Sequence, residues 1–164
     1  MATLSTLCQI ERSTTGSVVT LTVTGCIDER SDLSPLLSLS GANTLVLDLA
    51  GVERINSVGV RDWIEAMRRI PADIAVYWDR TAVPMVCQMT MIANFHGHSH
   101  IRSIMAPYYC NTCDLEHQFL MTVDKALTSP PYEAPSFDCP DCGKPMNFDE
   151  MEEDYFASVA AIDA

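Results

Sequence analysis

Four cysteines in the second half of the chain have a spacing that could hold a metal ion. Two residues separate Cys110 from Cys113, two separate Cys139 from Cys142, and 25 residues lie between the two pairs. Two thiolates at this spacing can bind one side of a tetrahedral ion, and a second pair completes the coordination. The pattern therefore predicts one Zn²⁺ ion on four cysteines, with iron as the main competitor because it also suits a four-thiolate tetrahedron.

This ligand set predicts a structural role for the metal. All four ligands come from the protein, so no coordination position remains for water or a substrate. The rest of the sequence offers no nucleophile, base and orienting group that belong together. We therefore predict that the protein is not an enzyme.

The other histidines and cysteines have simpler interpretations. His117 lies between the cysteine pairs and could substitute as a ligand, although four cysteines suffice. Three alternate histidines could hold a second ion, but no cysteine or carboxylate close by in the sequence completes that site, so a surface loop is favoured. Three further cysteines lie in apolar contexts and are expected to be small buried residues. The histidines are His96, His98 and His100, and the cysteines are Cys8, Cys26 and Cys87.

Acidic charge is concentrated in the second half of the chain. Residues 1–105 carry ten acidic and eight basic residues, whereas residues 106–164 carry twelve acidic residues and two lysines. Nucleic-acid affinity comes mostly from lysine and arginine that neutralise phosphates. The second half is therefore a poor candidate for binding DNA or RNA.

The composition and the N-terminal sequence predict the cellular setting. The N-terminus lacks the basic start and long apolar stretch of a secretory signal, and no apolar run approaches the length that crosses a bilayer. Seven cysteines without such a signal favour metal binding over disulfides. Apolar residues make up 48% of the chain, enough for a core. We expect a soluble, cytoplasmic protein.

Strands and helices alternate in the first part of the chain. Val19, Leu21 and Val23 alternate with threonines, which is the pattern of a half-buried strand. From Val60 to Ile70 the apolar residues recur at helical spacing. This alternation predicts an α/β fold with an open mixed sheet and helices packed on it. The expected strands are 4–10, 18–24, 45–49, 74–78 and 101–105, a loop spans 50–57, and the expected helices are a short one near 33–37 and two longer ones at 60–70 and 84–95.

The cysteine-rich half predicts a small second unit. Residues 119–123 have the apolar pattern of a strand in a zinc ribbon, and the proline-rich segment 129–135 would connect its two halves. The run DEMEED at 149–154 is expected to be a solvated helix face or tail. We therefore predict a domain at 1–105, a four-cysteine zinc ribbon at 106–148 and an acidic C-terminal tail at 149–164.

Residues 47–60, LDLAGVERINSVGV, resemble the central signature of the STAS domain, which occurs in anti-sigma factor antagonists and sulfate transporter tails. The family pattern is an apolar strand ending in Asp-Leu, a Gly-Val turn, and Asp-Ser-(Ser/Thr)-Gly-Leu at the start of a helix. The order of strands and helices over residues 1–105 also fits the family. The resemblance implies a STAS-like mixed sheet followed by the separate zinc ribbon.

The resemblance also implies a switch at Ser57. In the antagonists, the matching serine is phosphorylated by a serine kinase that is itself the anti-sigma factor, and only the unphosphorylated form binds that kinase. Asn56 stands where the antagonists usually have Asp, and Val58 replaces a hydroxyl residue. The segment Asn56, Ser57, Val58 and Gly59 would form the partner contact. The alternative is that Ser57 serves as a plain helix cap.

These observations predict a regulatory protein-binding module with a structural zinc. Phosphorylation of Ser57 would add negative charge and disrupt an interface that fits a neutral hydroxyl. Two alternatives remain open at this point. One is a structural or assembly scaffold without a switch, and the other is a transcription-associated factor that acts through the zinc ribbon.

Overall fold

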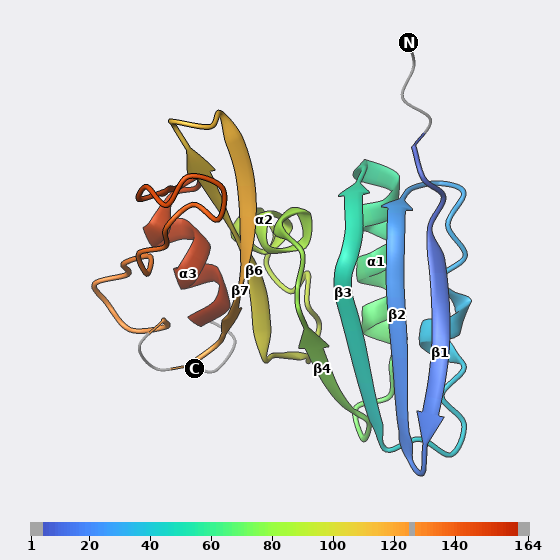
Figure 1. The fold of residues 1–164 in the computed structure, drawn as a ribbon. Helices are drawn as coiled ribbons and strands as arrows, with labels where there is room; N and C mark the ends of the chain where they lie inside the picture. Colours follow the sequence, from blue (N-terminus) through green and yellow to red (C-terminus); the bar gives the residue numbers. More distant parts are fainter. Residues whose placement is uncertain (1–4, 125–126, 161–164) are drawn as a thin grey trace.

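A five-stranded mixed sheet forms the first part of the molecule (Figure 1). The structure is a computed structural model that describes residues 5–124 and 127–160. The first two strands are antiparallel and the remaining neighbours are parallel, as the predicted α/β fold with a mixed sheet requires. In spatial order the strands are β1 (Gln9–Thr15), β2 (Val18–Ile27), β3 (Thr44–Ile55), β4 (Ala75–Asp79) and β5 (His100–Ile101).

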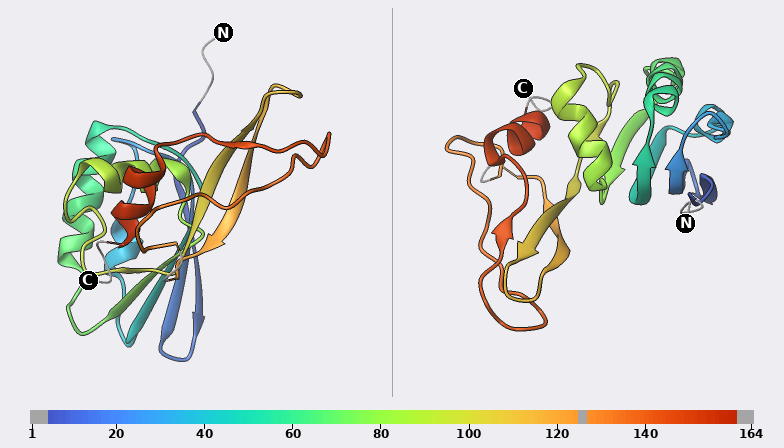
Figure 2. Two further views of the ribbon diagram at one scale, coloured as in Figure 1. Left: turned by 90° about the vertical axis from the view of Figure 1, so that its left-hand side faces the viewer. Right: turned by 90° about the horizontal axis from the view of Figure 1, so that it is seen from above.

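Helices cover one face of this sheet (Figure 2). They are the 3-10 helix η1 (Ser34–Leu37) and the α-helices α1 (Ser57–Arg69) and α2 (Val83–Met91). Alternate residues of β2 and β3 point toward them and are buried, for example Leu21 and Leu47. Trp63 of α1 and Trp78 of β4 pack edge to face with ring centroids 5.7 Å apart. The apolar periodicities of the sequence therefore form one continuous core.

A second, three-stranded sheet carries the cysteines. Its strands, in the order β7-β6-β8, are β6 (Ser103–Cys110), β7 (Leu115–Thr122) and β8 (Asn147–Phe148). The predicted strand 101–105 is therefore divided between two sheets, because β5 ends at Ile101 and β6 begins at Ser103. Thr81 bonds to both Ser103 and Met105 through its backbone, which ties the start of β6 to the first sheet.

The acidic C-terminal segment forms a docked helix where the sequence predicts a tail. Helix α3 (Glu152–Ala160) lies beside α2, and its residues Tyr155, Phe156 and Val159 are buried. The acidic residues Glu152, Glu153 and Asp154 occupy the first turn, where negative charge interacts favourably with the helix dipole. The predicted tail residues beyond 160 lie outside the described residues.

Several element boundaries differ from the sequence prediction. Strand β3 continues through Ile55, across most of the segment predicted as a loop, and α2 ends at Met91, short of Phe95. The first strand runs from Gln9 to Thr15, beyond the predicted end at residue 10, while the predicted start at residue 4 lies outside the described residues. The predicted domain boundary between residues 105 and 106 falls inside β6. In the described part of the chain, no helix is long and apolar enough to cross a membrane.

Candidate metal centre and serine loop

The four predicted cysteine ligands lie together in the second unit, which is the three-stranded sheet with its cysteine turns over residues 103–148, also called the metal unit. Their sulfur atoms are all within 4.8 Å of one another. The Cys110 sulfur is 3.6 Å from that of Cys142, and the Cys139 sulfur is 3.9 Å from that of Cys113. With a zinc–sulfur distance of about 2.3 Å, tetrahedral geometry places the sulfurs roughly 3.8 Å apart. The four cysteines therefore fit a metal such as zinc.

Two similar turns position these ligands. In each, the residue after the second cysteine donates its amide to the carbonyl of the first, from Asp114 to Cys110 at 2.9 Å and from Gly143 to Cys139 at 2.8 Å. Both residues have a positive φ, 57° for Asp114 and 73° for Gly143. Glycine adopts this conformation without strain, and Asp is one of the few other residues that tolerates it. The glycine signals the second turn in the sequence, whereas no glycine marks the first.

Backbone amides stabilise thiolate charge at the site. The Cys113 amide lies 3.4 Å from the Cys110 sulfur and lowers the pKa of that thiol to about 7. The neighbouring Cys142 thiol raises the pKa of Cys113 to about 12, because crowded thiols resist losing several protons. A divalent cation would replace these protons, so metal affinity should fall as the pH falls.

His117 and Asp141 lie at the edge of the thiolate cluster. His117 is on β7 and Asp141 lies between the two cysteines of the second turn. The Nε2 atom of His117 is 3.1 Å from Asp141 Oδ2 and 3.9 Å from the Cys139 sulfur. The sequence marked His117 as an alternative ligand, but nothing in the one-dimensional spacing links it to Asp141.

The other histidines and cysteines lie away from this cluster. His98 Nε2 is 3.0 Å from the Ile74 carbonyl oxygen, and burial lowers the pKa of His96. Across residues 5–124 and 127–160, these histidines belong to no group suited to a metal. Cys26 is buried, whereas Cys8 and Cys87 are only partly buried. Burial raises the pKa of Cys87 to about 11.

The serine loop lies at the junction of β3 and α1. Asn56 is the N-cap residue of α1, and its Oδ1 accepts a hydrogen bond of 2.8 Å from the Gly59 amide. Its Nδ2 donates to Glu29 Oε2 at 2.8 Å. Ser57 is the first residue of the helix and is exposed. The alternative prediction that Ser57 caps the helix is therefore wrong, and within the described residues its hydroxyl makes no hydrogen bond.

Gly59 allows α1 to approach the sheet closely. A Cβ atom at this position would lie 2.2 Å from the carbonyl oxygen of Ile27 at the end of β2. The same carbonyl accepts a 3.1 Å hydrogen bond from the Asn56 amide. Any side chain at position 59 would therefore force this junction apart, and the glycine is required by packing.

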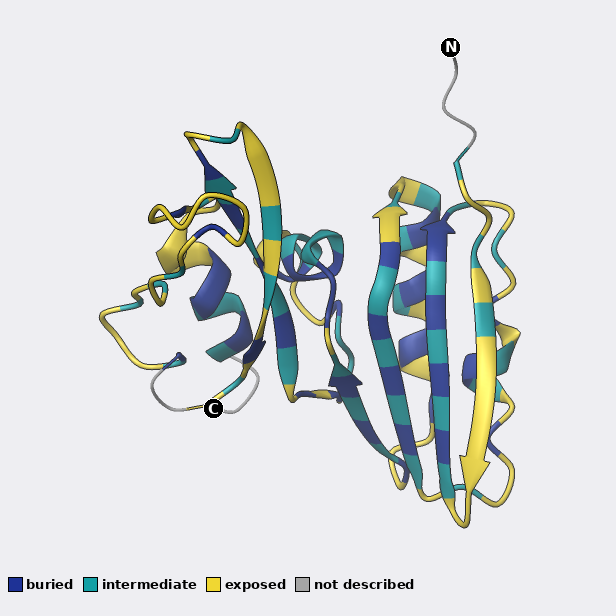
Figure 3. Cartoon of the chain, in the orientation of Figure 1, coloured by how far each residue is buried: buried dark blue, intermediate teal, exposed yellow. Residues whose placement is uncertain are grey.

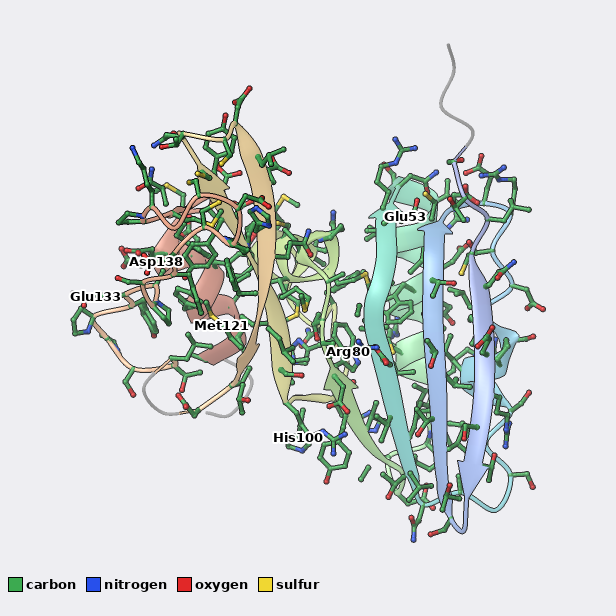
Figure 4. All side chains as sticks on the ribbon, in the orientation of Figure 1. Glu53, Arg80, His100, Met121, Glu133 and Asp138 are labelled. Carbon is green, nitrogen blue, oxygen red and sulfur yellow. The ribbon has the colours of Figure 1, made fainter. Side chains whose placement is uncertain are left out.

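A shallow groove extends along α1 from Ser57. Its volume is about 490 Å³, and its lining combines the apolar side chains of Val60 and Ile64 with charged side chains. The charged side chains are Arg61, Asp62, Glu65 and Arg68. The groove is far from the cysteine cluster. In Figure 4, Glu53 marks the end of β3 near the groove and Asp138 marks the cysteine cluster, and the two residues are on opposite sides of the molecule.

No protein-family model matches this chain, and no curated protein is significantly similar to it.

Proposed function

We propose that this protein is a non-enzymatic regulatory module, resembling a STAS-type anti-sigma factor antagonist, that binds a protein partner at the start of α1. The observation that carries the proposal is the state of Ser57. Its hydroxyl is exposed and unbonded within the described residues, while Asn56 performs the capping that would otherwise explain a serine here. A serine free of a structural role at the mouth of a groove is suited to modification.

The local electrostatics are compatible with a phosphate at Ser57. The start of a helix favours negative charge, because its first amides and the helix dipole point outward. No acidic residue lies in the first turn of α1 to oppose a phosphate. Phosphorylation adds roughly −1.5 to −2 charges. Such a charge would disrupt binding of an apolar partner surface to Val60 and Ile64.

A structural zinc on the four cysteines completes the proposed module. Its four ligands form a closed set, so its role would be to hold β6, β7 and the second cysteine turn together. The partner suggested by the STAS resemblance is a serine kinase that acts as an anti-sigma factor. Two observations support that resemblance. One is the signature over residues 47–60, and the other is the mixed sheet, in which this segment runs from β3 into α1.

Capture from a lysate of the source cell tests the switch. The baits are the wild-type chain, Ser57→Ala, Ser57→Glu and the control Ser40→Glu. Ser40 is also exposed, but it precedes β3 whereas Ser57 follows it, so the two serines lie at opposite ends of this long strand. Bound proteins are identified by mass spectrometry, and zinc content and thermal unfolding confirm that each bait is folded.

The proposal predicts one pattern across the four baits. Wild type, Ser57→Ala and Ser40→Glu should capture the same partner, and Ser57→Glu should lose it at least tenfold. Equal capture by all four baits would contradict the switch and favour a scaffold without one. Loss with Ser57→Ala as well would mean that the hydroxyl itself is part of the contact.

A further inference from the structure

His117, Asp141 and Cys139 form a second metal-ligand cluster that shares one cysteine with the four-thiolate site. One ligand atom from each residue lies within 4.8 Å of the others. At usual zinc distances of about 2.0–2.3 Å, tetrahedral nitrogen, oxygen and sulfur ligands lie roughly 3.3–3.6 Å apart. The distances from His117 Nε2, 3.1 Å to Asp141 and 3.9 Å to Cys139, lie on either side of that range.

The arrangement differs from an ordinary supporting hydrogen bond to a metal ligand. A histidine that orients a site normally uses one ring nitrogen for the metal and the other for a carboxylate or carbonyl. Here the same nitrogen, Nε2, faces both the Asp141 carboxylate and the Cys139 sulfur. One proton on Nε2 can be directed well at only one of them, whereas a cation between the three atoms would satisfy all three.

Charge favours a second cation at this position. One Zn²⁺ on four thiolates leaves an excess of two negative charges, and the Asp141 carboxylate adds a third close by. A second divalent ion would reduce this to a single negative charge. Beyond Lys144, two residues after Cys142, the surrounding sequence supplies little compensation, because residues 106–164 contain two lysines against twelve acidic residues.

We propose that His117, Asp141 and Cys139 bind a second, exchangeable divalent cation such as Zn²⁺, with the Cys139 thiolate bridging the two ions. Cys139 is 2% exposed, but the side chains of His117 and Asp141 are 25% and 54% exposed. The second ion is therefore reached from solvent. Three protein ligands leave a fourth position for water or for a donor atom of a partner.

The proposal rests on the four-thiolate site, because the two sites share Cys139, and the test reads them separately. The full-length chain is first loaded with one equivalent of zinc and then titrated with Co²⁺. Metal per chain is measured by mass spectrometry after gel filtration, and visible absorption reports the coordination of the added cobalt. The variants are His117→Gln and Asp141→Asn. The controls are His100→Gln, a histidine outside the cluster, and Asp138→Asn, an exposed carboxylate beside Cys139.

Wild type and both controls should bind a second equivalent with the spectrum of tetrahedral cobalt bearing a thiolate. Each cluster variant should keep the first zinc and weaken the second ion at least about tenfold, the minimum expected from the effect of supporting groups. Saturation of the wild type at one equivalent would overturn the proposal. So would a second equivalent that Asp141→Asn leaves unchanged, a variant whose exposed side chain should not affect folding. A wild type that binds no metal would instead contradict the four-thiolate site.

Discussion

In the first unit, Leu47, Trp63 and Trp78 are completely buried between the five-stranded sheet and its helices, whereas on β7 of the metal unit one side chain, Met121, is buried and most of the others are exposed. In Figure 3 the inner strands β2 and β3 of the first sheet are mostly dark blue and teal, whereas β7 is largely yellow, as is the outer strand β1 of the first sheet. Burial of apolar surface stabilises the first unit. Small units bury little apolar surface, which is the usual reason for a structural metal.

The metal unit nevertheless has a local aromatic core. Tyr108 of β6 packs edge to face on Phe119, Phe137 and Phe148, with ring centroids 5.1–5.4 Å apart. Phe148 in turn stacks on Phe156 of α3 at 5.2 Å. This cluster joins the metal unit to α3, and α3 lies on α2 of the first unit. The cysteines therefore hold one end of the metal unit together, and the aromatic residues pack its other end against α3.

Replacing Cys139 should give the largest effect, and this effect should be confined to the metal unit. Metal binding in small structural sites is worth on the order of 10–16 kcal/mol, so Cys139→Ser should lose the zinc and the fold of residues 106–148. Metal analysis and hydrogen exchange on β6 and β7, compared with β2 and β3, measure this. Cys8→Ser is the control. If the variant kept one equivalent of zinc, or if both units lost hydrogen-exchange protection equally, the metal unit would not differ from the first unit in its dependence on metal.

Trp63→Ala should destabilise the first unit and leave the metal unit intact. Trp63 contacts Trp78 and Phe95, and removing it leaves a cavity in the apolar core. We expect a loss of about 3–5 kcal/mol in the stability of the first unit, with zinc content unchanged, measured by urea unfolding and metal analysis. The control Arg68→Ala removes a side chain that is 73% exposed on the same helix and should change stability little.

Tyr155→Phe tests the connection between the two units. The Tyr155 hydroxyl donates a 2.6 Å hydrogen bond to the Met105 carbonyl, and burial raises the pKa of this tyrosine. The substitution leaves the partly buried Met105 carbonyl without this hydrogen bond, which costs about 1–3 kcal/mol. Hydrogen exchange should show the loss in both α3 and the start of β6. The control is Tyr132→Phe, since the Tyr132 hydroxyl makes no hydrogen bond within the described residues. An equal effect of both substitutions would contradict a specific role for this bond.

Asn56→Asp should give the smallest effect and one that depends on pH. The Asn56 amide lowers the pKa of Glu29 by donating a hydrogen bond to its carboxylate. That bond stabilises the fold above the ordinary carboxyl pKa of about 4.3 and is lost as the pH falls through the lowered value. Asp at position 56 replaces the bond with repulsion between two carboxylates.

The variant should therefore raise the Glu29 pKa, measured by NMR titration, and should be less stable than wild type at neutral pH. The difference in thermal unfolding temperature should disappear in acid, where both carboxyls are protonated. Glu53→Gln, which changes another carboxylate near the end of β3, is the matched control. An unchanged Glu29 pKa in Asn56→Asp would mean that the Asn56–Glu29 contact does not persist in solution.

The spacing of Cys110, Cys113, Cys139 and Cys142 was enough to predict the site that the structure brings together, because two short turns fix the local geometry of each pair. The alternation of apolar residues likewise predicted the mixed sheet and α1, since burial on one face repeats along the chain with a fixed period. Helix α3 was harder to predict. It has few apolar residues, these become buried only where the helix packs on α2, and its acidic first turn suggested a tail.

The α/β fold class, the main helix and the four-cysteine cluster thus follow from local spacing along the chain. The cap of α1 is local, since Asn56 accepts from the Gly59 amide three residues on, but only the tertiary structure brings Glu29, far from Asn56 in the sequence, to the other side of the Asn56 amide. It also brought His117 and Asp141, which are 24 residues apart, to the same side of Cys139. Contacts between distant segments depend on how the strands and turns pack in space, and no local pattern in the sequence records that packing.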